Sequence, residues 1–275
     1  MKRPLAFAFI LACFLSGVEG PKAQAQETTN DFALWQELNI SKDLGHDWSI
    51  DIGGDLRNRI DLLDRASIGV GVDKKVGKYL KFGLSYSFLA KHYAETTEAA
   101  YKDSDPTILK GYNIDADNWA QRHRLAFDIT GDKRLWKTLR ISLRERYQFT
   151  YQPSRDITRT RLRDANYDAE GNITGWDTEE TVTKAKEARY RHLLRSRLKF
   201  AIDRKKWDWE PFASVEFHND LRQSFHLDKL RAAIGTEYKV NRTLRINAAY
   251  VFTHENDEDG NQNIHALSVG CSIKL

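Results

Sequence analysis

The chain has 275 residues, of which 41% are hydrophobic and 30% charged, and it carries a formal net charge of +4. This composition excludes an intrinsically disordered protein, and the small net charge does not indicate a nucleic-acid-binding protein. Beyond the first residues no run of about 18 apolar residues occurs, which excludes a transmembrane helix in that part of the chain.

Residues 1–25 have the features of an export signal peptide. A basic start, Lys2-Arg3, precedes an apolar run, and residues 23–25 form the A-x-A pattern of a signal-peptidase site. We therefore expect cleavage after Ala25 and a mature domain of residues 26–275. The alternative is a lipoprotein signal, in which Cys13 is lipidated instead.

The rest of the chain repeats one pattern, in which apolar and polar residues alternate as they do along half-buried β-strands. The alternation predicts about eleven strands of roughly 9–13 residues, and no amphipathic helix is apparent. The predicted strands are 32–40, 48–57, 66–73, 80–91, 119–129, 139–151, 190–202, 209–217, 230–238, 244–252 and 267–275.

The connections between these strands alternate between short polar turns and longer polar stretches. The longest are 93–118 and 153–187, and we expect both to be surface loops. Short turns on one side and long loops on the other predict an all-β, antiparallel transmembrane β-barrel of about 10–12 strands, with short periplasmic turns and longer extracellular loops. If both termini lie in the periplasm, the number of strands must be even. The barrel then has ten strands if 32–40 is not part of the wall, or twelve if one strand is missed.

The alternative fold is a soluble β-sandwich or lipocalin-like barrel, with the apolar face inside. The opposite face is too charged for a protein core, which favours apolar residues that face lipid. Aromatic residues near strand ends are also typical of the interfacial girdles of membrane barrels. They are Trp35, Trp48, Tyr79, Trp119, Tyr147, Tyr151, Tyr190, Trp209 and Tyr250.

Two segments carry a resemblance to a known family. They are NDFALWQELNISKDLGHDWSIDIGGDLRNRI, from Asn30, and SIGVGVDKKVGKYLKFGLSYSF, from Ser67. The D-F-x-L-W opening, the W-S-x-x-I strand and the YLKFGLSY return resemble the domain-of-unknown-function 2490 family of outer-membrane proteins of Gram-negative bacteria, common in Bacteroidota. The resemblance implies a barrel in the cell outer membrane, and it brings no assigned activity and no functional residue.

Charged residues on the lumen side of the predicted strands are the main candidate site. Strand parity places two groups of charges inside, and the acidic group comes mainly from strands before and after the basic one. One hypothesis is a narrow, porin-like aqueous pore that prefers anionic solutes, and the other is an ion-pair network that fills a closed lumen. The basic wall is Arg122, Arg124, Arg140, Arg144, Arg146, Arg191, Arg195, Arg197 and Lys199, and the acidic wall is Asp51, Asp55, Asp73, Glu210, Glu216 and Glu237.

Other patterns give weaker indications of chemistry. The segment NYDAEGNITGWD, residues 166–177, approximates the spacing of a calcium loop, but a surface hairpin turning at Glu170-Gly171 explains it better. Ser214 and His218 are about 13 Å apart along an extended strand, too far for the hydrogen bond that a nucleophile and its base need, and Ser224 and His226 lie in a predicted loop. We therefore expect no catalytic residues, no metal site and no cofactor.

The sequence thus predicts an outer-membrane barrel that is not an enzyme and acts as a structural barrel or as an anion-preferring channel. The alternatives are a surface-binding module that uses the loops 93–118 and 153–187 and, less well supported, a lipid hydrolase. The expected partners are outer-membrane lipid and lipopolysaccharide, the barrel-assembly machinery during insertion, and small anionic solutes, but no nucleic acid.

Overall fold

A computed structural model describes residues 29–275 apart from 60–61, 103–104, 137, 171, 205–206 and 258–259. The expected signal peptide, with both Cys13 and the cleavage site after Ala25, lies outside the described residues. The described part is built of β-strands joined by turns and short irregular segments. None of its residues forms a helix long and apolar enough to cross a membrane.

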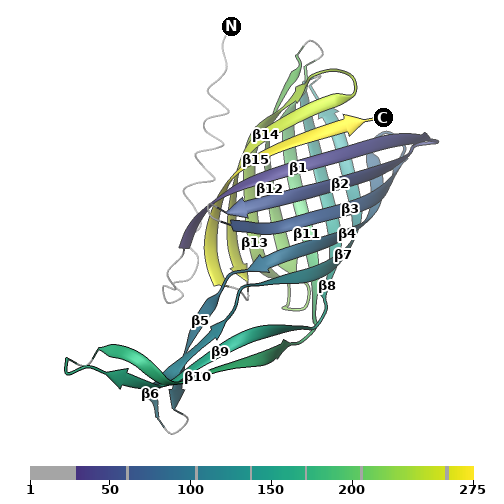
Figure 1. Ribbon diagram of the computed structural model, residues 1–275. Helices are drawn as coiled ribbons and strands as arrows, with labels where there is room; N and C mark the ends of the chain where they lie inside the picture. The colour runs from purple at the N-terminus through teal and green to yellow at the C-terminus, as the bar shows by residue number, and fades with distance from the viewer. Residues whose placement is uncertain are drawn as a thin grey trace.

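Eleven strands form a closed barrel, and four more form a separate sheet beyond one end of it (Figure 1). Neighbouring strands around the barrel run in the order β1-β2-β3-β4-β7-β8-β11-β12-β13-β14-β15, and β15 returns to β1. The barrel strands are β1 (Thr29–Gly45), β2 (Trp48–Arg59), β3 (Leu62–Val76), β4 (Leu80–Tyr93), β7 (Asn118–Leu135), β8 (Leu139–Gln152), β11 (Arg189–Ile202), β12 (Trp209–Asp220), β13 (His226–Lys239), β14 (Leu244–Asp257) and β15 (Gly260–Lys274).

The barrel closes through a parallel pair. β1 lies parallel to β15, in register from Thr29 opposite Gln262 to Ser41 opposite Lys274, whereas the other barrel pairs are antiparallel. The prediction of an even strand number is therefore wrong: the segment 32–40 is part of the wall, and the described strands of the barrel number eleven. An even number is needed only where the first and last strands meet antiparallel. Hereafter the end with the short turns is called the turn end, and the other the loop end.

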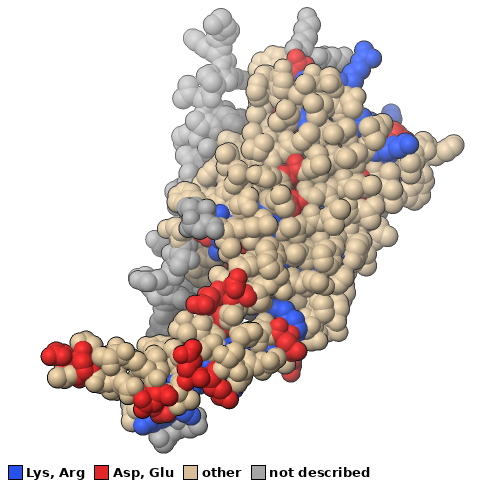
Figure 2. All heavy atoms as spheres, in the orientation of Figure 1, with Lys and Arg blue, Asp and Glu red and all other residues tan. Residues whose placement is uncertain are grey.

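The apolar residues of the alternating strands point out of the barrel. On β3, Ile68 and Val70 are 62% and 43% exposed, whereas the hydroxyl of Ser67, the residue before Ile68, donates a hydrogen bond to the Asp55 carboxylate inside. β-Branched residues suit such a pleated wall because their side chains pack against those of neighbouring strands. The face in Figure 2 shows the result, since the barrel wall there is almost free of charged side chains.

Trp35 does not belong to this outer surface. In β1 the exposed apolar residues are Phe32, Leu34 and Leu38, and their parity turns Trp35 into the lumen, where it is only 5% exposed. It packs there against Val251 and other apolar residues of β14 and β15. The expectation that Trp35 is an outward aromatic residue at a strand end is therefore wrong, because the register of β1 decides the direction of its side chain.

A repeated aromatic motif lies on the outer surface. Three strands carry the sequence Tyr-x-Phe, and a histidine of the neighbouring strand lies opposite each phenylalanine. The Nδ1 atom of this histidine forms a hydrogen bond of 2.6–2.8 Å with the tyrosine hydroxyl. The three groups are Tyr86, Phe88 and His123; Tyr147, Phe149 and His192; and Tyr250, Phe252 and His265. Both rings and hydroxyls are thus presented outwards, as in an interfacial girdle.

The two longest polar stretches are strands rather than loops. They form a four-stranded sheet of β5 (Thr96–Lys102), β6 (Asp105–Asp115), β9 (Arg155–Tyr167) and β10 (Ile173–Lys186), in the order β10-β9-β6-β5. Figure 1 shows this sheet beyond the loop end of the barrel. Tyr112 packs edge-on against Trp176 within it. Their high polarity concealed these strands in the sequence, because a sheet exposed on two sides buries few apolar residues.

Asp115 is the electrostatic centre of this sheet. It is buried and accepts hydrogen bonds from Arg159 and, at 3.2 Å, from Lys186 and Lys184. The bond from Arg159 is the main cause that holds the pKa of the Asp115 carboxyl well below its usual value, against the opposing effect of burial.

Acid is therefore expected to loosen the sheet. Because the native pKa is lowered, the carboxylate stabilises the sheet above the pKa of an unfolded aspartate, about 3.9, and that stabilisation is lost as the pH falls further. Asp115→Asn should destabilise the sheet at pH 7 by about 2 kcal/mol and flatten its acid transition. Tryptophan fluorescence measures both effects, and the signal of Trp176 is obtained by subtracting the spectrum of the Trp176→Phe variant. An unchanged acid transition in Asp115→Asn would contradict the role of Asp115 in the sheet.

Candidate anion site in the barrel lumen

The predicted basic wall lies on three strands that are neighbours in the barrel, in the order β7-β8-β11. Arg122, Arg124, Arg191 and Arg195 line a cavity at the loop end of the lumen. Of the remaining members, Arg146 lies opposite Arg195 in the register, Arg197 lies opposite Arg144, and the others lie towards the turn end. Four of them form ion pairs: Arg140 with Glu210, Arg144 with Glu216, Arg146 with Asp128 and Lys199 with Glu237.

The predicted acidic residues occupy two separate places. Glu210 and Glu216 lie on β12 and Glu237 on β13, directly beside the basic wall rather than across the lumen from it. The other three lie on β2 and β3: Asp51 and Asp73 line a cavity at the turn end, and Asp55 contacts Arg57, Arg65 and Ser67. The ion pairs of the basic wall therefore join strands that are neighbours or next neighbours.

A band of buried ion pairs lies at mid-height on the lumen side of β7, β8, β11 and β12. Glu216 binds Arg195 at 2.6 Å and Arg144 at 3.3 Å, while Asp128 binds Arg146 through two hydrogen bonds of 2.5 and 2.8 Å. The side chains of Glu216, Arg195 and Arg144 are only 7%, 11% and 14% exposed. This group of Glu216, Asp128, Arg144, Arg146 and Arg195 is called the middle layer below.

One cavity lies on each side of the middle layer along the barrel. The loop-end cavity has a volume of about 150 Å³ and the turn-end cavity about 560 Å³, and no residue lines both. Four of the five middle-layer residues line neither of them, and Arg195 lines the loop-end cavity alone. The middle layer thus lies between the levels of the two cavities along the barrel, on the wall formed by β7, β8, β11 and β12.

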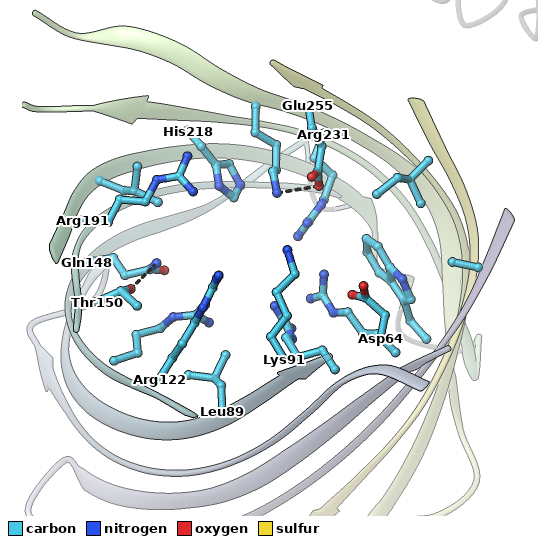
Figure 3. Close-up of a pocket in the computed structure, with 18 of the residues that line it drawn as sticks. Asp64, Leu89, Lys91, Arg122, Gln148, Thr150, Arg191, His218, Arg231 and Glu255 are labelled. Atoms are coloured by element: carbon cyan, nitrogen blue, oxygen red, sulfur yellow. Dashed lines mark hydrogen bonds and ion pairs between the residues drawn. The ribbon is translucent and has the colours of Figure 1, made fainter. Parts of the chain in front are cut away.

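The lining of the loop-end cavity is mainly basic, although six of its basic residues form ion pairs with carboxylates: Arg57, Arg59, Arg65, Arg191, Arg195 and Lys229. Ten of its lining residues are Arg or Lys and two are acidic, whereas the turn-end cavity has six basic and five acidic residues. In Figure 3, Lys91 and Arg231 project towards the middle of the lumen from opposite sides. The ten are Arg57, Arg59, Arg65, Lys91, Arg122, Arg124, Arg191, Arg195, Lys229 and Arg231, and the two are Asp64 and Glu255. An enclosed excess of cations attracts anions strongly, because little water screens it.

Two of these guanidinium groups have unused hydrogen-bond donors. Arg124 has neither an ion pair nor a side-chain hydrogen bond with any described residue, and its Nε is buried. Arg65 binds Asp55 through one terminal nitrogen at 2.6 Å, but its own Nε is buried without a partner. A buried donor without an acceptor is unfavourable, so an anion that reached these two groups would offset this cost.

Trp35 fixes the position of two further arginines. The guanidinium carbon of Arg57 lies 4.0 Å from the centre of the indole ring, and that of Arg231 lies 4.8 Å from it. Such stacking holds a guanidinium plane while its N–H groups stay available at the edge. The apolar contacts of Trp35 with Val251, Ile264 and Ala266 thus stabilise the cationic cavity from behind.

The weaker sequence candidates do not form a catalytic or metal site in the described residues. Asp168 accepts hydrogen bonds from Asn172, and Asp177 accepts one from Asn166, within the turn that joins β9 to β10. His218 lies inside the lumen, 3.5 Å from Glu216, and it forms no hydrogen bond with a described serine. No group of three or more His, Cys, Asp or Glu in the described part of the chain is arranged to hold a metal ion.

Several cavity residues were missed in the sequence. Arg57 and Arg231 have the lumen parity of their predicted strands, so the same parity rule finds them. Arg65 precedes the predicted strand 66–73, and no local signal shows that β3 begins at Leu62. Asp128 has the same parity as Arg122 and Arg124 in the predicted strand 119–129, so the parity rule finds it too, whereas Trp35 was interpreted as an outward aromatic residue.

The fold and this lumen define a β-barrel protein with a charged interior. A family model described as a protein of unknown function, DUF2490, matches residues 32–264. The chain belongs to this family, as its opening motifs predicted. No curated protein matches the chain.

Proposed function

We propose that this protein is an integral barrel of the bacterial outer membrane that takes small anionic solutes into its lumen from the loop end. Its role is passive rather than catalytic, and the basic wall makes the pathway selective for anions. The observation that carries the proposal is the loop-end cavity, with ten basic and two acidic lining residues. Arginine is suited to this task because it stays charged and binds oxyanions through paired donors.

The outer surface supports a place in a membrane. Tyr79 at the turn end and the Tyr-x-Phe groups nearer the loop end bracket an exposed band of aliphatic residues such as Leu84 and Leu125. Tyr79, in the turn just before β4, and Phe88 of β4 are nine residues apart, which spans roughly 23 Å along the axis of a tilted barrel strand. That length fits the apolar band of an outer-membrane barrel, and its partners are then membrane lipid, lipopolysaccharide and the barrel-assembly machinery.

The middle layer limits what can pass. Because Glu216 joins Arg144 and Arg195 while Asp128 holds Arg146, these side chains narrow the lumen along the wall from β7 to β12. We therefore expect a small unitary conductance and transient occupancy of the loop-end cavity rather than the wide-open current of a general porin.

Conductance measurements test the proposal. The chain from residue 26, refolded and inserted into a planar bilayer under a salt gradient, should give an anion-selective reversal potential. Arg122→Glu together with Arg124→Glu should reduce or reverse this selectivity, because both side chains line the loop-end cavity. Arg242→Glu together with Arg245→Glu, in the turn-end cavity, is the matched control and should change it less. Cation selectivity, or silence from a barrel with heat-modifiable gel mobility, would reject an anion pathway.

A second candidate function concerns the four-stranded sheet. Its outer strands, β5 and β10, each have only one neighbour among the described strands, and acidic side chains gather over it in Figure 2. An open strand edge can bind an extended segment of another protein. Removal of this sheet, with the barrel still folded, should abolish such binding and leave the lumen selectivity unchanged.

A further inference from the structure

The arrangement around Arg124 indicates a discrete binding site rather than a diffuse charged surface. Arg124 lies on β7, and the charges within electrostatic range of it are mainly cations, Arg57, Arg65 and Arg195, with Asp55 as the nearby carboxylate. Burial of a guanidinium group among others is unfavourable unless an anion compensates for it. Asp55 compensates the charge of Arg124 from a distance, but no described side chain forms an ion pair or hydrogen bond with it.

The guanidinium groups reach the cavity from many sides. Arg57, Arg65, Arg124, Arg195 and Arg231 belong to five different strands, β2, β3, β7, β11 and β13, and all five line the loop-end cavity. Donors spread around a cavity in this way suit a tetrahedral oxyanion with several terminal oxygens better than a planar carboxylate, which a single arginine fork already satisfies.

The site is also held in place before any ligand arrives. Trp35 stacks on Arg57 and Arg231, and Arg195 is held by Glu216 and by the side-chain oxygen of Gln148 at 2.9 Å. Because these side chains are already ordered, binding has little further side-chain entropy to lose. The Nε groups of Arg65 and Arg124 are buried without an acceptor, so these two arginines gain most from an anion.

We infer that the loop-end cavity binds a dianionic phosphate group, free or as the end of a phosphate monoester, with Arg65 and Arg124 as its principal donors. This inference deepens the proposed function, because it names the class of anion that occupies the same lumen. Arg57 and Arg231 surround the group from the side of Trp35, and Arg195 contributes from the side of the middle layer.

Titration calorimetry of the detergent-solubilised barrel tests the site without any need for conduction. Inorganic phosphate at pH 8 should bind saturably, while acetate and chloride at the same ionic strength should not. Arg124→Gln should weaken phosphate binding about tenfold or more, as expected for the loss of a charge-assisted hydrogen bond. Arg245→Gln, an arginine of the turn-end cavity, is the matched control and should stay within about twofold of the unaltered protein.

A second pair of ligands identifies the charge state and the source of the phosphate. Sulfate stays dianionic at pH 5.5, whereas inorganic phosphate and phosphate monoesters both take up a proton between pH 8 and pH 5.5. The affinity for phosphate relative to sulfate should therefore fall on acidification. If glycerol phosphate binds as tightly as inorganic phosphate, the site accepts phosphate monoesters. If glycerol phosphate binds much more weakly than inorganic phosphate, the site is specific for free phosphate.

The outcomes separate this inference from the proposed function. No saturable heat with phosphate in the unaltered protein overturns the inference, as does an equal loss in Arg124→Gln and Arg245→Gln. If Arg124→Gln does not fold, the titration of the unaltered protein still decides whether phosphate binds. Arg65→Gln then provides the second variant that tests the donors. An anion-selective conductance without phosphate binding rejects the site alone, whereas phosphate binding by a non-conducting barrel rejects the pathway alone.

Discussion

Glu216→Gln is expected to destabilise the barrel by about 3–5 kcal/mol, because it leaves two buried guanidinium groups without their shared partner. Glu216 binds Arg195 at 2.6 Å and Arg144 at 3.3 Å, and all three side chains are nearly inaccessible to solvent. A glutamine retains the shape of the side chain but not the charge, so the repulsion between the two arginines is no longer offset. Urea unfolding followed by heat-modifiable gel mobility measures the loss.

A surface ion pair provides the control for this variant. Glu180 lies 3.5 Å from Arg161 in the four-stranded sheet, with both side chains about half exposed. Glu180→Gln should change stability by less than about 1 kcal/mol because water screens the pair. A Glu216→Gln barrel as stable as the Glu180→Gln barrel would show that the middle layer is hydrated and open rather than closed.

Trp35→Ala is expected to cost about 3–5 kcal/mol of stability, since it removes the largest apolar side chain from the lumen wall. The indole is 5% exposed and packs against Val251 and Ile264. Its loss also frees the guanidinium groups of Arg57 and Arg231, which should weaken phosphate binding in addition. Urea unfolding and calorimetry on the same samples measure the two effects.

Trp48 provides the matched control because it is an outward tryptophan near the turn end, 44% exposed and stacked on Lys74. Trp48→Ala should leave phosphate binding unchanged and should cost less stability than Trp35→Ala. Equal affinity for phosphate in the Trp35→Ala and unaltered proteins would refute a positioning role for Trp35. Trp35→Phe should recover part of the stability and part of the affinity, since a smaller ring still stacks on a guanidinium group.

The middle layer also determines which arginines are useful probes of selectivity. Charge reversal at Arg144 and Arg195 would place two new carboxylates beside Glu216 and would disturb folding before it changed selectivity. Arg122 instead bonds to Tyr93 and Gln152, and Arg124 has no partner among the described residues. Substitutions at these two positions therefore report on the cavity more directly.

The sequence by itself determined the strands of the wall and the direction of most side chains. Alternation with a period of two is a local property of an extended chain, so Arg124, Arg144 and Arg195 could be assigned to the lumen without knowledge of their neighbours. The family could be identified for a similar reason, since its motifs are short segments of single strands and turns. The apolar outer face and the polar inner face follow from the same alternation.

Only the tertiary structure decided how the wall closes and which charges meet. The parallel contact of β1 with β15 joins segments more than 200 residues apart, and no local pattern encodes the direction of that pairing. The neighbourhood of Glu216 depends in the same way on the strand order β8-β11-β12, which the intervening strands β9 and β10 conceal in the sequence. Arg124 could be predicted to face the lumen, but its lack of a partner could not, because ion pairing depends on the relative register of many strands.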